Sequence, residues 1–323
     1  MKLVLVPCAA RSRRQERLFS LKLRSLKPAS TLFHPASSTL NIVIMAPSAT
    51  VLEGESANNI RYGGLGKSAD GKQFKVRSYP QFDTLEEERV YRKQHLAAAF
   101  RVFADHGYVE GITGHMSVVP SYDTFKTSTA DNPLSSVRDP ILPDHFWLNP
   151  ISQHFAHLTV SDLVLVNQKG EVVVGERPIQ PAAFAIHAEI LKARPDINSA
   201  AHAHSVYGKT YSAFGQELEM ITQDSLRFYK QHTVYRNFGG IVFDRKEGVR
   251  IAQALGDNKA VILQNHGLLT VGKSPDEAAW WFLALENLCQ VQLLADAAAA
   301  GGKQKIFISE EEAVYTNKQN GSR

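Results

Sequence analysis

Residues 193–205 read Ala-Arg-Pro-Asp-Ile-Asn-Ser-Ala-Ala-His-Ala-His-Ser. Pro195 closes a helical pattern, and the small residues after it predict a strand over residues 198–204. Side chains two positions apart on a strand point to the same face, so His202 and His204 should lie together on one side of it. We therefore expect both imidazoles to reach one ion.

A third histidine lies at the exit of a later strand. The apolar run at residues 260–263 predicts this buried strand, and Asn265-His266-Gly267 follows it. The glycine lets the chain turn sharply and leaves the imidazole uncovered. A lone histidine in a strand is usually a packed or surface residue, and H-x-H alone is a weak pattern. The combination is more specific, because three imidazoles around an open position are typical of a catalytic divalent metal. We predict such a site at His202, His204 and His266.

The remaining periodicity predicts an alternation of helices and strands. Helical patterns cover residues 84–106, 182–194, 206–214, 247–255 and 276–299. Strand patterns cover residues 146–148, 163–167, 172–174, 198–204, 241–243 and 260–263, with a further strand at Val271. This alternation predicts an α/β protein. The sequence holds no Gly-rich dinucleotide-binding or Walker-type phosphate loop.

Three segments resemble the class II aldolase/adducin family. Residues 193–205 are similar to its H-x-H segment, residues 263–272 to its N-H-G segment, and residues 111–117 to its N-terminal glycine turn. The resemblance implies a three-layer α/β/α sandwich with a mostly antiparallel central sheet. It also implies that His202, His204 and His266 bind Zn²⁺, or Fe²⁺ or Mn²⁺ in its place. By resemblance the protein forms a homo-oligomer, a tetramer with active sites between subunits.

The departures from the family pattern concern the substrate. Sugar-phosphate aldolases keep an acid 19 positions before the first histidine of H-x-H, and this chain has Ala183 there. An alanine cannot carry a proton. Two serines that bind the substrate phosphate are replaced by Pro181 and Ala182, and the asparagine of the glycine turn by His115. We therefore expect a substrate without a phosphate group.

Other residues are assigned to substrate binding or proton transfer. We assign Gly114 and His115 of the glycine turn, and Asn149 after the strand at 146–148, to substrate binding. Tyr235 matches a tyrosine that aldolases send into a neighbouring subunit's site, although it also fits a packed loop tyrosine. Asp224 lies where related epimerases keep an acid, in an alignment that needs a gap. His187 projects from the helix before the H-x-H strand, as a support for the metal site or as a core histidine.

The segment around Ala183 leaves the function open. Phe184, His187 and Ala188-Glu189-Ile190 resemble the adducin-like branch, although the adducin neck and lysine-rich tail are missing before Arg323. We favour a metal-dependent lyase for aldol cleavage, decarboxylation or epimerisation of a small non-phosphorylated hydroxy-carbonyl compound. One alternative is a non-catalytic, adducin-like protein that binds the actin cytoskeleton. A second is an iron-dependent oxygenase on the same scaffold.

Charge and composition divide the chain into segments. Residues 1–44 contain eight basic residues and one acid, a net charge of +7, which leaves −3 for residues 45–323 out of the total of +4. This leader has the composition of a mitochondrial transit peptide, or translation begins at Met45. We expect a flexible segment over 45–83, the aldolase/adducin-like domain over 84–308 and a polar C-terminal tail over 309–323.

The composition also bounds partners and location. The mildly acidic body has no basic footprint for nucleic acid. No run of about 18 apolar residues predicts a membrane span. Cys8 and Cys289 are the two cysteines, and a disulfide between the leader and the body is not expected. We expect a cytoplasmic protein, or a mitochondrial one if the leader is genuine.

Overall fold

The computed structural model describes residues 68–72, 79–109, 115–118, 139, 141–142, 144–238 and 245–321. The chain divides into two compact units, residues 1–54 and 55–323, and all the described residues belong to the second. The predicted leader, most of the segment over 45–83 and the predicted strand at 241–243 lie outside the described residues.

The described strands form one mixed sheet that is mostly antiparallel. Its spatial order is β4-β3-β2-β1-β5-β8-β7-β6, and β6–β7 is the parallel pair among these described strands. The strands are β1 His115–Val118, β2 Phe146–Leu148, β3 Val164–Val166, β4 Val172–Val174, β5 Ser199–Ala203, β6 His232–Tyr235, β7 Ala260–Leu263 and β8 Gly267–Gly272. The order places β5 and β8 side by side at the centre, which confirms the predicted sheet.

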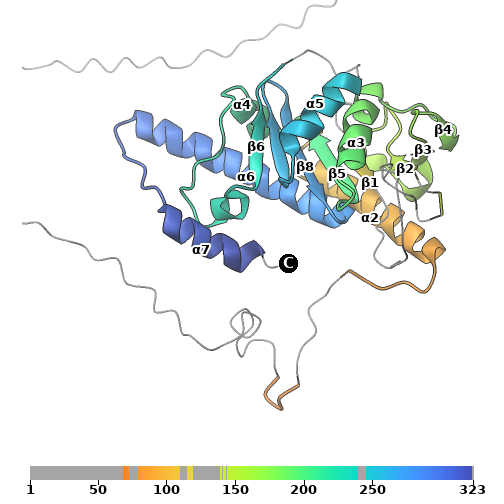
Figure 1. Cartoon of the computed structure of the whole chain (residues 1–323), viewed down its shortest axis with the longest axis horizontal. Helices are drawn as coiled ribbons and strands as arrows, with labels where there is room; N and C mark the ends of the chain where they lie inside the picture. Colours follow the sequence, from red (N-terminus) through yellow and green to blue (C-terminus); the bar gives the residue numbers. More distant parts are fainter. Residues whose placement is uncertain are drawn as a thin grey trace, which may run out of the picture. The chain divides into compact units, whose positions relative to one another are not determined.

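Helices cover both faces of this sheet, as Figure 1 shows. On one face lie α2 (Leu85–Asp105) and α6 (Pro275–Ala300), and on the other lie α3 (Pro181–Ala193) and α5 (Arg245–Leu255). The short α4 (Val206–Ser212) packs on α6 and β8. The predicted three-layer sandwich is therefore confirmed.

The two hydrophobic cores follow from strand alternation. On β8, Leu268 packs with Phe282 of α6 in one core, and the next residue, Leu269, packs with Ile186 of α3 in the other. A central strand covered on both faces needs apolar residues at successive positions, and the uninterrupted apolar runs of β7 and β8 supply them. Most of the predicted elements match the structure within two residues because their patterns are this strong.

Two elements differ from the prediction. Tyr235 lies in strand β6 rather than in a loop, because Thr233, Val234 and Tyr235 pair with β7. Helix α7 (Glu310–Gly321) occupies the predicted polar tail. Its start is a capping box, since Ser309 Oγ accepts from the Glu312 amide at 3.3 Å and the Glu312 carboxylate accepts from the Ser309 amide at 3.0 Å.

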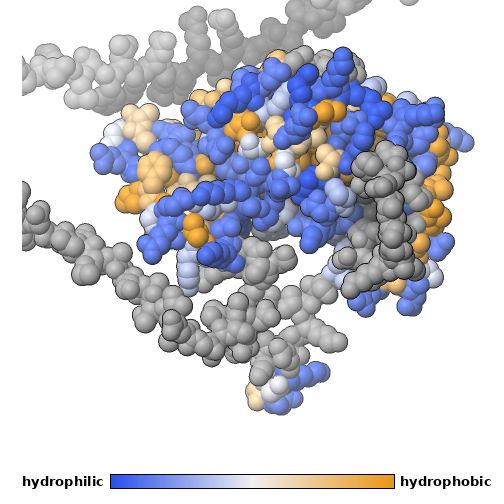
Figure 2. Space-filling model, in the orientation of Figure 1, coloured by the Kyte–Doolittle hydropathy of each residue, from blue (hydrophilic) through white to orange (hydrophobic). Residues whose placement is uncertain are grey.

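The outer edge of the sheet carries exposed apolar side chains. Val172, Val173 and Val174 of β4 are 36%, 45% and 46% exposed, and Figure 2 shows hydrophobic surface at this end of the molecule. In the described parts of the chain, no helix combines the length and the apolar character that crossing a bilayer requires.

The close packing of α3 on α5 gives a test of the fold. A Cβ at Gly248 would lie 2.0 Å from the Ala185 carbonyl oxygen. Alanine normally stabilises a helix relative to glycine by up to about 1 kcal/mol. We expect Gly248→Ala to lower the free energy of unfolding by about 1–3 kcal/mol instead, because the helices must move apart.

Urea unfolding measures this change. Val249→Ala is the matched control at an exposed neighbouring position, and it should change stability by less than about 0.5 kcal/mol. An unchanged or increased stability of Gly248→Ala would show that the two helices are not in close contact.

Candidate metal centre

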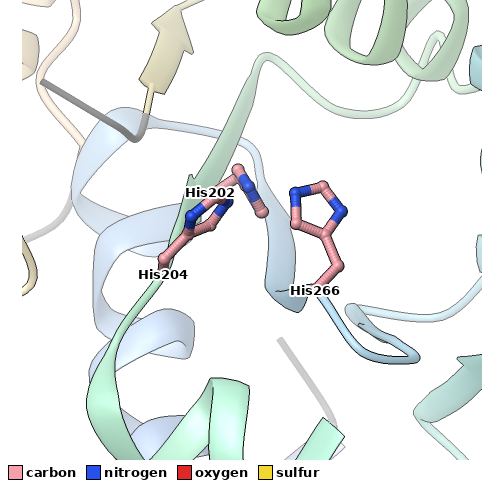
Figure 3. Close-up of side chains that lie close together, drawn as sticks. All are labelled: His202, His204 and His266. Carbon is pink, nitrogen blue, oxygen red and sulfur yellow. The ribbon is translucent and has the colours of Figure 1, made fainter. Parts of the chain in front are cut away.

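The three predicted histidines lie together at one end of the central strands. His202 lies in β5, His204 follows the end of that strand, and His266 lies in the turn between β7 and β8. The ring centroids are 5.0 Å apart for His202–His204, 4.7 Å for His202–His266 and 4.9 Å for His204–His266. One ring nitrogen from each lies within 4.8 Å of the others, and Figure 3 shows the rings directed toward one another.

A hydrogen bond orients His202. Its Nδ1 lies 2.8 Å from the Leu268 carbonyl oxygen of β8. A carbonyl oxygen can only accept, so Nδ1 carries the hydrogen and Nε2 keeps its lone pair. A metal-binding histidine usually donates its second ring N–H in this way.

Electrostatics keeps two of these imidazoles unprotonated at neutral pH. Burial holds the pKa of His202 well below its ordinary value, and the neighbouring His266 and His204 lower it further. Burial and His204 lower the pKa of His266 to about 4. A histidine binds a metal only through a neutral ring nitrogen. The residues therefore fit a divalent cation that accepts imidazole ligands, such as Zn²⁺ or Fe²⁺.

The turn that carries His266 has an uncommon backbone. Asn265 has a φ of +57°, the left-handed conformation that asparagine tolerates better than most residues. Its amide donates to the Ser212 carbonyl at 3.2 Å, and the His266 amide donates to the Leu263 carbonyl at 3.0 Å. These bonds hold the turn against α4 and β7, and so direct His266 toward β5.

His187 lies in α3, near enough to His202 to affect its pKa. It is fully buried, and its charge contributes to the low pKa of His202. Burial lowers the pKa of His187 itself to about 3. It is therefore a neutral neighbour at physiological pH, and its assignment to catalysis or metal support stays a prediction.

Two of the three positions assigned to substrate binding, 115 and 149, have their backbone at the same end of the sheet as His202. Gly114 lies outside the described residues, and so does the side chain of His115, but the backbone of His115 pairs with His202 across β1 and β5. On the other side of β1, Ser117 pairs with Leu148, which precedes Asn149. Asn149 is buried, and its Oδ1 has no hydrogen-bond partner among the described residues. A buried oxygen without a donor can accept from a ligand.

The other two predicted proton carriers lie in different surroundings. The Tyr235 hydroxyl donates to Glu247 Oε1 at 2.7 Å, and Arg250 Nε donates to the tyrosine oxygen at 3.3 Å. Asp224 is exposed at the start of the short helix η3 (Asp224–Phe228) and pairs with Arg227 at 2.9 Å. The described His, Cys, Asp and Glu side chains that cluster for a metal are the three histidines alone. The catalytic assignments of Tyr235 and Asp224 stay predictions.

One buried carboxylate at this site was not predicted from the sequence. Glu286 of α6 accepts from Ser205, the residue that follows His204, although 81 positions separate the two in the sequence. Burial raises the pKa of Glu286, and hydrogen bonds from Ser205 and the first turn of α4 oppose that rise. No local sequence pattern reports a contact between elements so far apart.

Comparisons with known proteins agree with this geometry. The family model described as "Class II Aldolase and Adducin N-terminal domain" matches residues 94–293. This chain belongs to the class II aldolase and adducin family. The match covers the H-x-H strand, the N-H-G turn and Glu286.

Relatives within the family are named for different functions. The decarboxylase NovR of Streptomyces niveus is 42% identical over 248 residues, 76% of this chain and 83% of the relative. The 4-hydroxy-3-prenylphenylpyruvate oxygenase/4-hydroxy-3-prenylbenzoate synthase of Streptomyces roseochromogenus is 42% identical over 245 residues, 75% and 80% of the two chains. Rat alpha-adducin is 33% identical over 51% of this chain but only 23% of its own length.

Solved structures show the same fold. The L-fuculose 1-phosphate aldolase from Glaciozyma antarctica PI12 superimposes with a TM-score of 0.64 and is 42% identical, over 76% of this chain and 89% of that one. An aldolase II superfamily protein from Pseudomonas syringae gives a TM-score of 0.61 at 29% identity. The class II aldolase fold is therefore shared with experimentally determined family members.

The low pKa of His187 predicts acid sensitivity of the metal-free protein. The pKa of His187 is about 3 in the folded state, against about 6.5 in the unfolded chain. The neutral side chain therefore makes its full contribution to the stability of the fold above pH 6.5. That stability is lost as pH falls from 6.5 toward 3, by up to about 1.4 kcal/mol for each pH unit. We expect His187→Leu to reduce this slope in urea titrations with EDTA present. The exposed His157→Gln should keep the wild-type slope, and equal slopes for all three proteins would contradict the assignment.

The left-handed turn predicts a second stability effect. We expect Asn265→Val to destabilise the fold by about 1–2 kcal/mol, because a β-branched residue is strained at this φ. Asn265→Gly keeps the same backbone without that strain and should be tolerated. Thermal unfolding compares the two variants, and equal melting temperatures would show that the turn relaxes without cost.

Proposed function

We propose that this protein is a divalent-metal-dependent lyase, of the decarboxylase type, that acts on a small non-phosphorylated hydroxy-carbonyl acid. The observation that carries the proposal is the convergence of His202, His204 and His266. When bound there, the cation would act as a Lewis acid that polarises a carbonyl and stabilises the negative charge that develops on it. The protein would supply the three imidazoles, two of them held neutral by burial.

Ala183 favours decarboxylation over aldol cleavage. Aldol cleavage starts by removing a proton from a hydroxyl group, which needs a base at the reacting atoms. Decarboxylation starts from a carboxylate that is already ionised. When a carbonyl lies β to this carboxylate, carbon dioxide leaves, the electrons of the broken bond form an enolate with that carbonyl, and a proton from solvent completes the product. A site with alanine at the acid's position is better suited to the second reaction. The name of the decarboxylase NovR, a relative matched over 83% of its length, supports the same choice.

The residues near the helix start support a substrate without phosphate. Pro181 opens α3, and Ala182 follows it. Neither side chain can donate a hydrogen bond to a phosphate oxygen. Asn149 Oδ1, which has no partner within the described part of the chain, accepts hydrogen bonds, and so suits a hydroxyl group rather than an anion.

An iron-dependent oxygenase is the second candidate. The Streptomyces roseochromogenus relative is named as an oxygenase for a phenylpyruvate, at 42% identity. Imidazole ligands accept iron as well as zinc, so the same three histidines suit both ions. A non-catalytic, actin-binding role has less support, because alpha-adducin is 33% identical to this chain and the two enzymes are 42% identical. A cytoplasmic homotetramer, with Tyr235 serving a neighbouring subunit, remains part of the proposal.

Metal analysis of the purified full chain tests the proposal first. We expect about one zinc, iron or manganese per chain, and its loss in the His202→Ala/His204→Ala variant because two ligands are removed. The control His154→Ala/His157→Ala removes two exposed histidines and should keep the metal. A folded wild type without metal, after growth with each ion supplied, would contradict the catalytic reading and favour the adducin-like alternative.

Activity measurements then separate the two enzyme classes. Carbon dioxide release and oxygen consumption are followed with a panel of phenylpyruvates and hydroxy-carbonyl acids. A lyase releases carbon dioxide without consuming oxygen, and an oxygenase consumes oxygen only in the iron-loaded form. Turnover of a sugar phosphate in preference to its dephosphorylated form would contradict the proposed substrate class.

A further inference from the structure

Glu286 is a buried carboxylate in the middle of α6. The residue is 2% exposed. Its carboxylate accepts from the Ser205 hydroxyl, from the Tyr207 amide at 2.9 Å and from the Gly208 amide at 2.7 Å. All three donors belong to the start of α4, the helix that begins directly after His204 and Ser205.

This carboxylate takes the place of a local helix cap. Ser205 occupies the N-cap position of α4, where a serine side chain normally accepts from the first turn. Here the Ser205 side chain makes no such bond, and its hydroxyl donates to Glu286 instead. Glu286 accepts from the two amides that the serine leaves unpaired, and its negative charge suits the positive end of the helix.

The first turn of α4 also contacts the strand that orients His202. A Cβ at Gly208 would lie 2.5 Å from Leu268 Cγ and 2.7 Å from Ser205 Oγ, so the turn lies directly against β8. The Leu268 carbonyl is the acceptor for His202 Nδ1. One carboxylate therefore fixes a turn that begins directly after His204 and contacts the side chain of Leu268, whose carbonyl accepts from His202.

We propose that Glu286 is a positioning residue for the metal centre, which sets the orientation of His204 through Ser205 and supports His202 through α4 and Leu268. The inference rests on the proposed function, because it requires a metal at these histidines. Glu286 is not a catalytic residue, since protein donors occupy both of its oxygens and the side chain is closed to solvent. Its effect should therefore be on metal affinity and ligand geometry.

The test compares Glu286→Gln with wild type in the full chain. The glutamine amide keeps one acceptor oxygen, but its NH₂ group is a donor and cannot accept from a second α4 donor. We expect zinc affinity to fall 10- to 100-fold, as for other residues that orient metal ligands. The visible absorption spectrum of the cobalt-loaded protein should shift, because it reports the arrangement of the ligands. Ser205→Ala removes one of the three contacts, and should weaken zinc binding in the same direction by a smaller factor.

Gln292→Ala is the matched control for a general loss of stability. Gln292 is a buried side chain of the same helix, 3% exposed, and its amide donates to Glu219 at 2.6 Å and Asp296 at 3.0 Å. The control should lower the melting temperature but leave zinc affinity and the cobalt spectrum at their wild-type values.

The outcomes separate this inference from the proposed function. A wild type that binds none of zinc, cobalt, iron and manganese overturns both. A wild type that binds them, with Glu286→Gln equal to it in affinity and spectrum, overturns the positioning role alone, as does an equal loss in Gln292→Ala. If Glu286→Gln does not fold, Ser205→Ala decides, and an unchanged affinity there overturns the inference.

Discussion

Antiparallel pairing of β5 with β8 is the contact on which the candidate site depends. It places His202 opposite Leu269, so that the neighbouring Leu268 carbonyl accepts from the His202 ring. It also brings the end of β5, with His204, beside the start of β8, with His266. A register shift of one residue would turn His202 to the other face of the sheet and separate the three imidazoles.

Burial gives these histidines the state that a metal requires. The same cover that excludes water lowers the pKa values of His202, His266 and His187. Acidification therefore destabilises the folded state, because these buried histidines are protonated only at a cost in free energy. A bound cation would offset part of that loss of stability. The position of His202 and His266 at the end of the central strands therefore both brings the ligands together and, through burial, keeps these two neutral.

Local patterns were sufficient for most of the architecture. The apolar run of β7, the capped helix α2 and the proline-opened helix α6 each carry a complete signal within a few residues, and the structure has them where the pattern predicts. Strand β6 was missed because polar residues precede it and its partner β7 is 25 residues later. Helix α7 was missed because its composition is polar, although Ser309 and Glu312 mark its start.

The sequence by itself determined the family, the layered fold and the identity of the three histidines, because strand parity and the N-H-G turn are local properties. The tertiary structure alone decided which nitrogen of His202 donates to the Leu268 carbonyl, that the Tyr235 hydroxyl binds Glu247, and that Glu286 caps α4. These contacts join residues on separate elements, and in the case of Ser205 and Glu286 they are 81 positions apart. No pattern of neighbouring residues encodes such contacts, because they arise only when the packed layers bring distant side chains together.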